Sequence, residues 1–182
     1  MWKAEQFVMQ LEQLKTLWNL LKDTVLMVKW FVMIDFKKAF DTVSRNFLFK
    51  TLQAFGFGYS FIRWIHTFYK NISSCVLNNG FSTAPFSVER GVRQRDPLSP
   101  YLFIIVLETL CISIRRSKDI QGITVDAEEI KLGLFADDLT GFLRNDISLH
   151  KFLEKLLENV QASGLIMIRL KSCYLAIVCA PF

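Results

Sequence analysis

The segment KLGLFADDLTGFL (Lys131–Leu143) places two adjacent aspartates between two apolar runs. The runs 132–136 and 139–143 have the composition of buried strands, so Asp137 and Asp138 are expected at the tip between them. A buried carboxylate without a partner is unfavourable, and a second like charge beside it is more so. The pair is explained either by an aspartate-rich turn or by a divalent cation such as Mg²⁺, which carboxylate oxygens bind. The segment alone leaves both explanations open.

A second aspartate ends another predicted strand. The run Val25–Ile34 is rich in β-branched and aromatic residues and reads as a largely buried strand that ends at Asp35. If this strand neighbours 139–143 in one sheet, Asp35 and Asp137 converge at the same end. Such a pair is typical of a two-metal site, in which ions roughly 4 Å apart hold the attacking and leaving oxygens of a phosphoryl transfer. Otherwise Asp35 is a strand-end residue that caps the segment after it.

The remaining pattern predicts helices mixed with hairpins. This indicates an α+β fold, an antiparallel sheet with helices packed on one face. The last helix is expected to have Ser148 as its N-cap and Gly164 as its stop. Apolar spacing predicts helices at 4–22, 47–55, 61–69, 100–115 and 148–162. Short strands are predicted at 75–77, 86–88, 120–125 and 130–135.

Composition excludes several classes of protein. Of 182 residues, 52% are hydrophobic, which is enough to form a core and argues against disorder. The four cysteines lack CxxC spacing, so reduced thiols are expected rather than zinc ligands or disulfides. No apolar run approaches the roughly 20 residues of a membrane span, and the N-terminus does not resemble a signal peptide. An intracellular location, nuclear or cytoplasmic, is therefore the default expectation. The net charge of +5 permits an anionic partner without requiring one.

Four segments in order resemble the palm motifs of reverse transcriptases from non-LTR (long interspersed element type) retrotransposons. They are FVMIDFKKAFDTVSRNFLFKTL (31–52), RGVRQRDPLSPYLF (90–103), LGLFADDLTGFL (132–143) and the weaker SGLIMIRLKS (163–172). The resemblance covers about residues 25–175. It implies a polymerase palm over 25–182 with fingers and thumb largely missing, as in a truncated element copy. It also implies an N-terminal helical segment, 1–24, that is a remnant or unrelated.

The resemblance also implies catalytic residues. Asp35 and Asp137 would be the principal ligands of two Mg²⁺ ions, or of Mn²⁺, with Asp138 as the supporting carboxylate. Lys171 would assist the departing pyrophosphate. Taken singly, Lys171 would be a solvated surface charge.

Nucleotide-binding residues follow from the same resemblance. Phe40 would exclude a ribose 2′-hydroxyl and so select deoxynucleotides, whereas an isolated Phe is more often part of the core. Gln94 would contact the incoming nucleotide and the template. The backbone from Phe36 to Ala39 would lie near the triphosphate, where its N–H groups and Lys37 or Lys38 would meet phosphate oxygens.

The implied reaction is RNA-templated DNA synthesis, with an RNA template, a DNA primer and a deoxynucleotide as partners and no membrane. Two alternatives remain: a catalytically dead remnant with at most weak nucleic-acid binding, and a helix-rich interaction module in which the aspartates form a turn.

The chain departs from the family at Arg95, where relatives carry a small residue, commonly glycine. If the backbone there has a positive φ, arginine would strain it. Ile166 and Ile168 stand where the family usually has Lys and Asn.

Overall fold

The computed structural model describes residues 30–125, 127–135 and 137–174, without the side chains of 168–174. The predicted helix 4–22, the segment 1–24 with its boundary at residue 25, and the first half of the strand predicted at 25–34 lie outside the described residues. The described part of that strand begins at Trp30 and ends at Phe36, one residue after Asp35.

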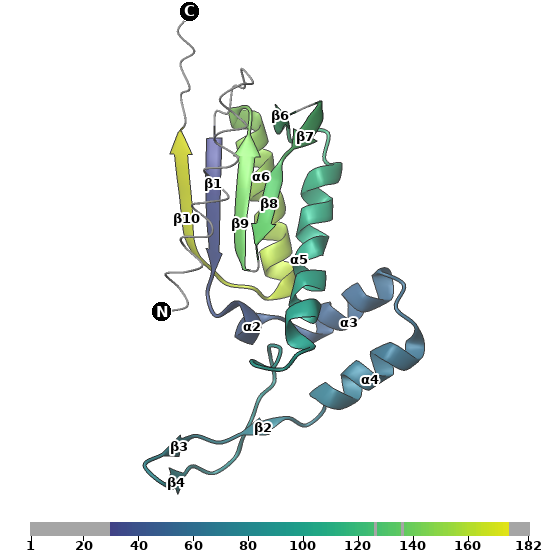
Figure 1. Cartoon of the computed structure of the whole chain (residues 1–182), viewed down its shortest axis with the longest axis vertical. Coiled ribbons are helices and arrows are strands. Elements are labelled where there is room, and N and C mark those ends of the chain that lie inside the picture. Colours follow the sequence, from purple (N-terminus) through teal and green to yellow (C-terminus); the bar gives the residue numbers. More distant parts are fainter. Residues whose placement is uncertain (1–29, 126, 136, 175–182) are drawn as a thin grey trace, which may run out of the picture.

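A four-stranded antiparallel sheet forms the centre of the fold (Figure 1). Its order is β10-β1-β9-β8, so two strands from the last third of the described chain flank the first one. The strands are β1 (Trp30–Phe36), β8 (Leu132–Phe135), β9 (Asp138–Leu143) and β10 (Met167–Tyr174). The predicted adjacency of the two aspartate-bearing strands is confirmed.

Helices α5 (Ser99–Arg116) and α6 (Asp146–Ser163) cover one face of this sheet (Figure 1). Three further helices lie beyond the end of the sheet, where α3 packs against α5. They are α2 (Ala39–Thr42), α3 (Arg45–Ala54) and α4 (Tyr59–Tyr69). The expected α+β architecture, with helices on one face of an antiparallel sheet, is confirmed. No helix in the described part of the chain is long and apolar enough to span a bilayer.

Strand alternation positions the core. Val32, Ile34 and Phe36 of β1 are buried, as expected for every second residue facing the helices. In β9, Gly141 lies so close to α6 that an added Cβ would stand 2.9 Å from the Phe152 ring. The sheet and α6 therefore pack more closely than a larger residue at position 141 would permit.

The predicted strand 130–135 is wrong in one respect, because it is interrupted at Lys131. The buried ammonium of Lys131 donates to the carbonyls of Ser117 (2.7 Å) and Arg115 (3.2 Å) at the C-terminus of α5. A cation there satisfies carbonyls that the helix leaves unpaired. Two strands result, since β7 (Glu128–Ile130) pairs with β6 (Ile123–Val125) whereas β8 pairs with β9.

A narrow arm carries the short strands between α4 and α5 (Figure 1). Near its base β2 (Ser73–Ser74) pairs with β5 (Phe86–Ser87), and at its tip β3 (Leu77–Asn78) pairs with β4 (Phe81–Ser82). The tip turns at Asn79 and Gly80, both of which have a positive φ.

Both ends of α6 are set by side-chain and backbone chemistry. Asn145 is the N-cap and accepts a hydrogen bond from the Ser148 N–H (2.8 Å), so the prediction of Ser148 as the cap is wrong. The Ser148 hydroxyl is instead buried and accepts from the Gln121 N–H (2.8 Å). The predicted stop is confirmed, since Gly164 has a left-handed φ of 74°.

Candidate active site

Three aspartates gather at one edge of the central sheet. Asp35, the penultimate residue of β1, is the Cα partner of Asp138, the first residue of β9. Asp137 lies in the turn immediately before β9, at the tip of the β8–β9 hairpin. Residues about a hundred positions apart in the sequence are thus brought together at the predicted place.

Side chains alternate between the two faces of a strand, and this alternation places aspartate side chains on the face of the sheet that α5 and α6 leave uncovered. The preceding pair, Ile34 and Leu139, is buried against the helices. Asp35 and Asp138 therefore face the other way, and Asp35 is exposed while Asp138 and Asp137 are half-buried. A ligand at this end of the sheet can reach the carboxylates without unfolding the core.

The donor set at this edge suits a hard cation. Carboxylate oxygens are the ligands that Mg²⁺ takes in proteins, usually one or two of them, with waters and substrate phosphates completing the shell. Among the residues described here, no group of three or more His, Cys, Asp or Glu side chains forms a cage. The described residues at this edge thus supply carboxylate oxygens but no preformed cage of three protein ligands.

The turn after β1 supplies a cation beside the aspartates. The Phe36 side chain is buried in the core, so only its backbone is available to a substrate. The Lys37 N–H donates to the Ile166 carbonyl (2.6 Å), which leaves the exposed Lys37 ammonium as the group that can meet a phosphate. Lys38 takes a left-handed φ of 45° and starts α2.

Phe40 is held by packing on both its ring and its backbone. Its ring stacks on Phe103 of α5 with centroids 4.8 Å apart and an interplanar angle of 23°. Its carbonyl accepts from the Val92 N–H (2.7 Å), which fixes α2 against the loop before α5. Phe40 is half-buried. Part of its side chain packs in the core, as is common for an isolated Phe, and part remains at the surface.

Gln94 has a charged partner that sequence reasoning missed. Its amide nitrogen donates to both carboxylate oxygens of Asp41, at 2.9 Å and 3.0 Å. Asp41 lies within the first of the four motifs (31–52), and the resemblance assigns it no role. The signal that could have found it is a second aspartate one residue after Phe40. The contact aligns the loop of Gln94 with the end of α2.

Arg45 clamps the same loop and was also missed. Its guanidinium donates at 3.2 Å to the carbonyls of Gly91, Tyr69 and Arg90, so one side chain joins α3, α4 and the loop. Burial lowers the pKa of Arg45. An arginine nevertheless stays charged at neutral pH, because its ordinary pKa is far higher.

Gly91 allows this loop to touch α2. It has a φ of +79°, and a Cβ added there would lie 2.7 Å from backbone atoms of Asp41 and Phe40. The loop, α2 and the base of the arm enclose a cleft of about 630 Å³ that is rich in cationic side chains. Its polar lining includes Asp41, Gln94, Arg45, Arg90 and Arg93.

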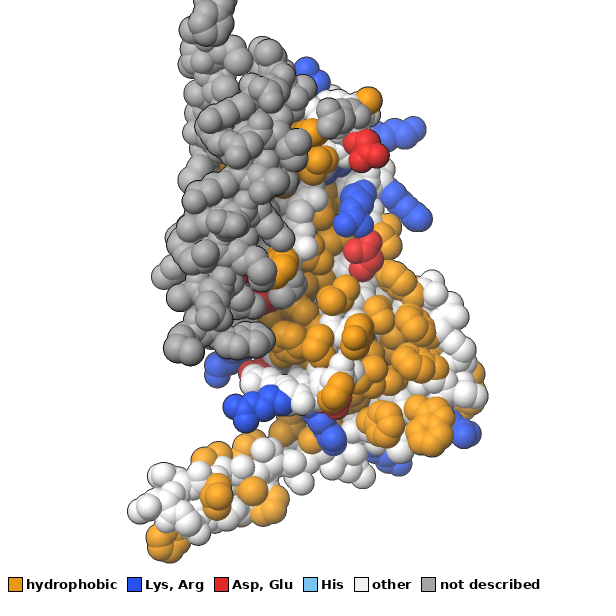
Figure 2. Space-filling view, in the orientation of Figure 1, with side chains coloured by type: hydrophobic (Ala, Val, Ile, Leu, Met, Phe, Trp, Pro, Cys, Tyr) orange, Lys and Arg blue, Asp and Glu red, His pale blue; other side chains and the backbone are white. Residues whose placement is uncertain are grey.

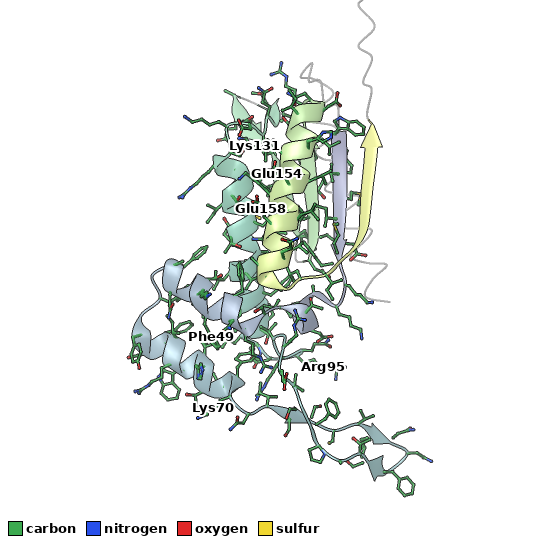
Figure 3. All side chains as sticks on the ribbon, turned by 180° about the vertical axis from the view of Figure 1, so that it is seen from behind. Phe49, Lys70, Arg95, Lys131, Glu154 and Glu158 are labelled. Atoms are coloured by element: carbon green, nitrogen blue, oxygen red, sulfur yellow. The ribbon has the colours of Figure 1, made fainter. Side chains whose placement is uncertain are left out.

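Arg95 has the backbone geometry that its departure from the family suggested. Its φ is +64°, in the left-handed region that favours glycine. The side chain is exposed and projects from the loop beyond the end of the sheet (Figure 3). The position therefore accepts arginine sterically, at an energetic cost in the backbone.

The Lys171 prediction can be followed only in the backbone. Lys171 belongs to β10 and is the Cα partner of Met33, two residues before Asp35 in β1. The weaker motif SGLIMIRLKS is thus placed beside the first aspartate strand. The role of the Lys171 side chain, which lies outside the described residues, stays a prediction.

Comparison with known proteins identifies related sequences. A family model described as "Reverse transcriptase (RNA-dependent DNA polymerase)" matches residues 3–176. The chain is 33% identical over 132 residues to the Pol polyprotein of the type-2 retrotransposable element R2DM of Drosophila melanogaster, covering 72% of this chain and 12% of that protein. It is 32% identical over 156 residues to that of the type-1 element R2 of Popillia japonica, covering 82% and 22%. The chain thus spans less than a quarter of the length of these relatives.

Solved structures share the fold. Telomerase of Candida tropicalis, in complex with a TWJ fragment of telomeric RNA, superposes with a TM-score of 0.64 at 14% identity, covering 92% of this chain and 29% of that one. The same telomerase without ligand gives a TM-score of 0.63 at 16% identity, covering 88% and 31%. At these identities the likeness establishes a shared fold and no more. The family model and the sequence relatives confirm the resemblance drawn from the four motifs.

Proposed function

Because the chain belongs to the reverse transcriptase (RNA-dependent DNA polymerase) family, we propose that it carries the catalytic palm of an RNA-directed DNA polymerase. A primer 3′-hydroxyl attacks the α-phosphate of a deoxynucleotide on an RNA template. The new bond joins the primer O3′ to that phosphorus, the bond to the bridging oxygen breaks, and the hydroxyl proton and pyrophosphate leave. The observation that carries the proposal is the pairing of Asp35 with Asp138, beside Asp137, at one end of the sheet, on the face that α5 and α6 leave uncovered.

Asp35 and Asp137 are the proposed ligands of two Mg²⁺ ions, with Asp138 as the supporting carboxylate. When bound, such ions lower the pKa of the attacking hydroxyl and stabilise the charge that develops on the leaving group. The carboxylates would fix where such ions lie, and thereby the point at which the primer 3′-hydroxyl and the triphosphate meet, which supplies orientation. Lys171 would meet the departing pyrophosphate.

The nucleotide is proposed to lie between the sheet edge and the loop of Gln94. Lys37, exposed beside Asp35, supplies a cation to the triphosphate. Phe40, braced on Phe103, blocks a ribose 2′-hydroxyl with a ring that has little freedom to move. Gln94, held by Asp41, then faces the base and the template in one fixed orientation.

Arg95 favours a second candidate, a chain that binds nucleic acid and catalyses little. An L-residue at a φ of +64° strains the loop next to Gln94, in the place where the family resemblance leads us to expect a small residue, commonly glycine. Under this alternative the palm keeps its basic side chains and its affinity for RNA, and nucleotide addition is lost.

Primer extension on an RNA template, with Mg²⁺ or Mn²⁺, tests the proposal. Asp137→Asn and Asp35→Asn each remove a charge and leave the shape nearly unchanged. Each is expected to lower the extension rate by at least about a hundredfold, as does the loss of a transition-state stabiliser elsewhere.

Asp119→Asn, an exposed aspartate far from the edge, is the matched control and is expected to extend at the wild-type rate. Equal rates for wild type and Asp137→Asn would refute catalysis by this edge. RNA binding that weakens with salt, without extension by any variant, would favour the second candidate.

A further inference from the structure

The outer surface of α4 carries a row of exposed aromatic rings. Phe61, Trp64 and Phe68 recur at spacings of three and four, so they line one flank of the helix. Their exposed fractions are 38%, 60% and 49%. The row is made of two ring pairs: Phe57 stacks on Phe61 with centroids 5.1 Å apart, and the rings of Trp64 and Phe68 lie 6.1 Å apart. Exposed apolar patches of this kind mark interaction sites.

A basic row runs along the other flank of the same exposed side. Arg63 and Lys70, seven residues apart, are both exposed. Residues 42–88 contain four Lys or Arg side chains and no Asp or Glu, so no acidic side chain in this stretch offsets the two cations. Figure 2 shows hydrophobic side chains gathered over the region of α3 and α4, with Lys and Arg side chains at its rim.

We propose that this surface, the α4 platform (Phe61, Arg63, Trp64, Phe68 and Lys70), binds single-stranded RNA. Bases would stack on the aromatic row, and phosphates would meet the basic row. Stacking on aromatic side chains beside a positive track is how proteins hold single strands without reading their sequence. The row from Phe61 to Phe68 is about 10 Å long, the length of roughly three stacked nucleotides.

The platform leads to the loop of the candidate active site. The Arg93 guanidinium donates to the Phe68 carbonyl (3.2 Å), and the Arg93 N–H donates to the Tyr69 hydroxyl (3.4 Å). Arg93 also lines the cleft beside Gln94. The strand on the platform would accordingly be the template, an identification that rests on the proposed function.

The charge pattern favours a single strand over a protein partner or a duplex. A partner protein docked on α4 would have to cover Arg63 and Lys70 together with the apolar row, and buried unpaired cations are unfavourable. A duplex presents phosphates on its outside and keeps its bases stacked within, so the rings of Trp64 and Phe68 would have no partner. A single strand satisfies both rows at once.

Fluorescence anisotropy of the full chain with a labelled 20-nucleotide uridine-rich RNA tests the platform. Divalent metal and nucleotide are left out, so that binding is measured apart from catalysis. Trp64→Ala and Phe68→Ala are each expected to weaken binding by about tenfold. Trp64→Phe should retain most of the affinity, whereas Trp64→Leu, which keeps the apolar surface without a ring, should bind as weakly as Trp64→Ala.

The salt dependence isolates the basic row. The double variant R63Q/K70Q should reduce the slope of log K against log salt by about 1.4, or about 0.7 for each lost phosphate contact. Phe81→Ala, which removes an exposed ring on the arm, is the matched control and should leave the affinity unchanged. Unlabelled single-stranded RNA should compete, and duplex RNA should not.

Affinity within twofold of wild type for Trp64→Ala would overturn the inference, even if extension by the chain is intact. A change in self-association of Trp64→Ala at unchanged RNA affinity would assign α4 to a protein interface instead. Tighter competition by single-stranded DNA than by RNA would reject the template as the occupant. Loss of RNA affinity in a chain that never extends a primer would uphold the platform and reject the proposed catalysis.

Discussion

Replacement of Arg95 by glycine is expected to stabilise the chain, although the substitution removes a whole side chain. Arg95 has a φ of +64°, where the Cβ of an L-residue approaches the carbonyl oxygen that follows it. Glycine has no Cβ and takes this conformation without strain. The arginine side chain is exposed, so little packing is lost when it is removed.

The magnitude follows from two opposing effects. The left-handed conformation costs an L-residue about 1–2 kcal/mol. Glycine loses more backbone freedom on folding, which offsets about 0.5–1 kcal/mol of that gain. The net increase in the free energy of unfolding is therefore about 0.5–1 kcal/mol. For a domain of this size that corresponds to a rise in Tm of roughly 2 °C.

Urea unfolding followed by circular dichroism measures the change. Arg95→Ala is the matched variant, since it removes the same side chain and keeps the Cβ, and it should show no gain. Arg144→Gly, at an exposed arginine outside the left-handed region, should instead lose stability, because glycine adds freedom to the unfolded chain. Equal stability of Arg95→Gly and Arg95→Ala would refute the assignment of strain to this backbone position.

Three further perturbations probe the loop and the core. Gly91→Ala should destabilise the chain by about 3 kcal/mol or more in the same assay, because residue 91 has a left-handed conformation and the new methyl group would lie 2.7 Å from the backbone of Asp41. A loss under about 1 kcal/mol would contradict this close approach. Burial, and secondly the charge of Glu108, raises the pKa of the Cys111 thiol to about 11, so the folded chain keeps a proton that the unfolded chain loses above its ordinary pKa. The free energy of unfolding should therefore fall by about 1 kcal/mol between about pH 8 and pH 10, and in Cys111→Ala the fall over this range should be smaller by about 1 kcal/mol. Asp41→Ala, which frees Gln94, should raise the KM for deoxynucleotide more than it lowers kcat in primer extension, and unchanged kinetics would reject the positioning of Gln94 by Asp41.

Local patterns sufficed for the parts of the fold that depend on local chemistry. The apolar runs around Asp35 and Asp137 predicted three strands and a turn, and the resemblance to palm motifs implied that the aspartate-bearing strands are neighbours. Gly164 predicted the end of α6, because a left-handed C-cap favours glycine over other residues.

Other features depend on tertiary contacts that no local pattern reveals. Asn145 and Ser148 are both good caps, and the choice between them is made by Gln121, whose N–H takes the Ser148 hydroxyl as its acceptor. Lys131 interrupts a strand because its ammonium reaches the carbonyl of Ser117, fourteen residues earlier, just after the end of α5.

The candidate site also contains residues that local motifs reveal and contacts that only the folded chain reveals. Its aspartates lie within recognisable motifs, so they could be named from the sequence. The contact between Gln94 and Asp41 joins residues 53 positions apart, and Arg45 reaches three carbonyls from two other parts of the chain. Neither spacing nor composition signals such contacts before the chain is folded.

The central claim is tested most directly by measuring Mn²⁺ binding to the full chain in the presence of a deoxynucleotide. Electron paramagnetic resonance would compare the wild type with Asp35→Asn, Asp137→Asn and the double variant. If the two carboxylates share one site, each single substitution should weaken Mn²⁺ binding at that site. The loss of binding free energy in the double variant should then be smaller than the sum of the losses in the two single variants. Single variants that bind Mn²⁺ as wild type does, or losses that add independently, would show that Asp35 and Asp137 do not hold ions together.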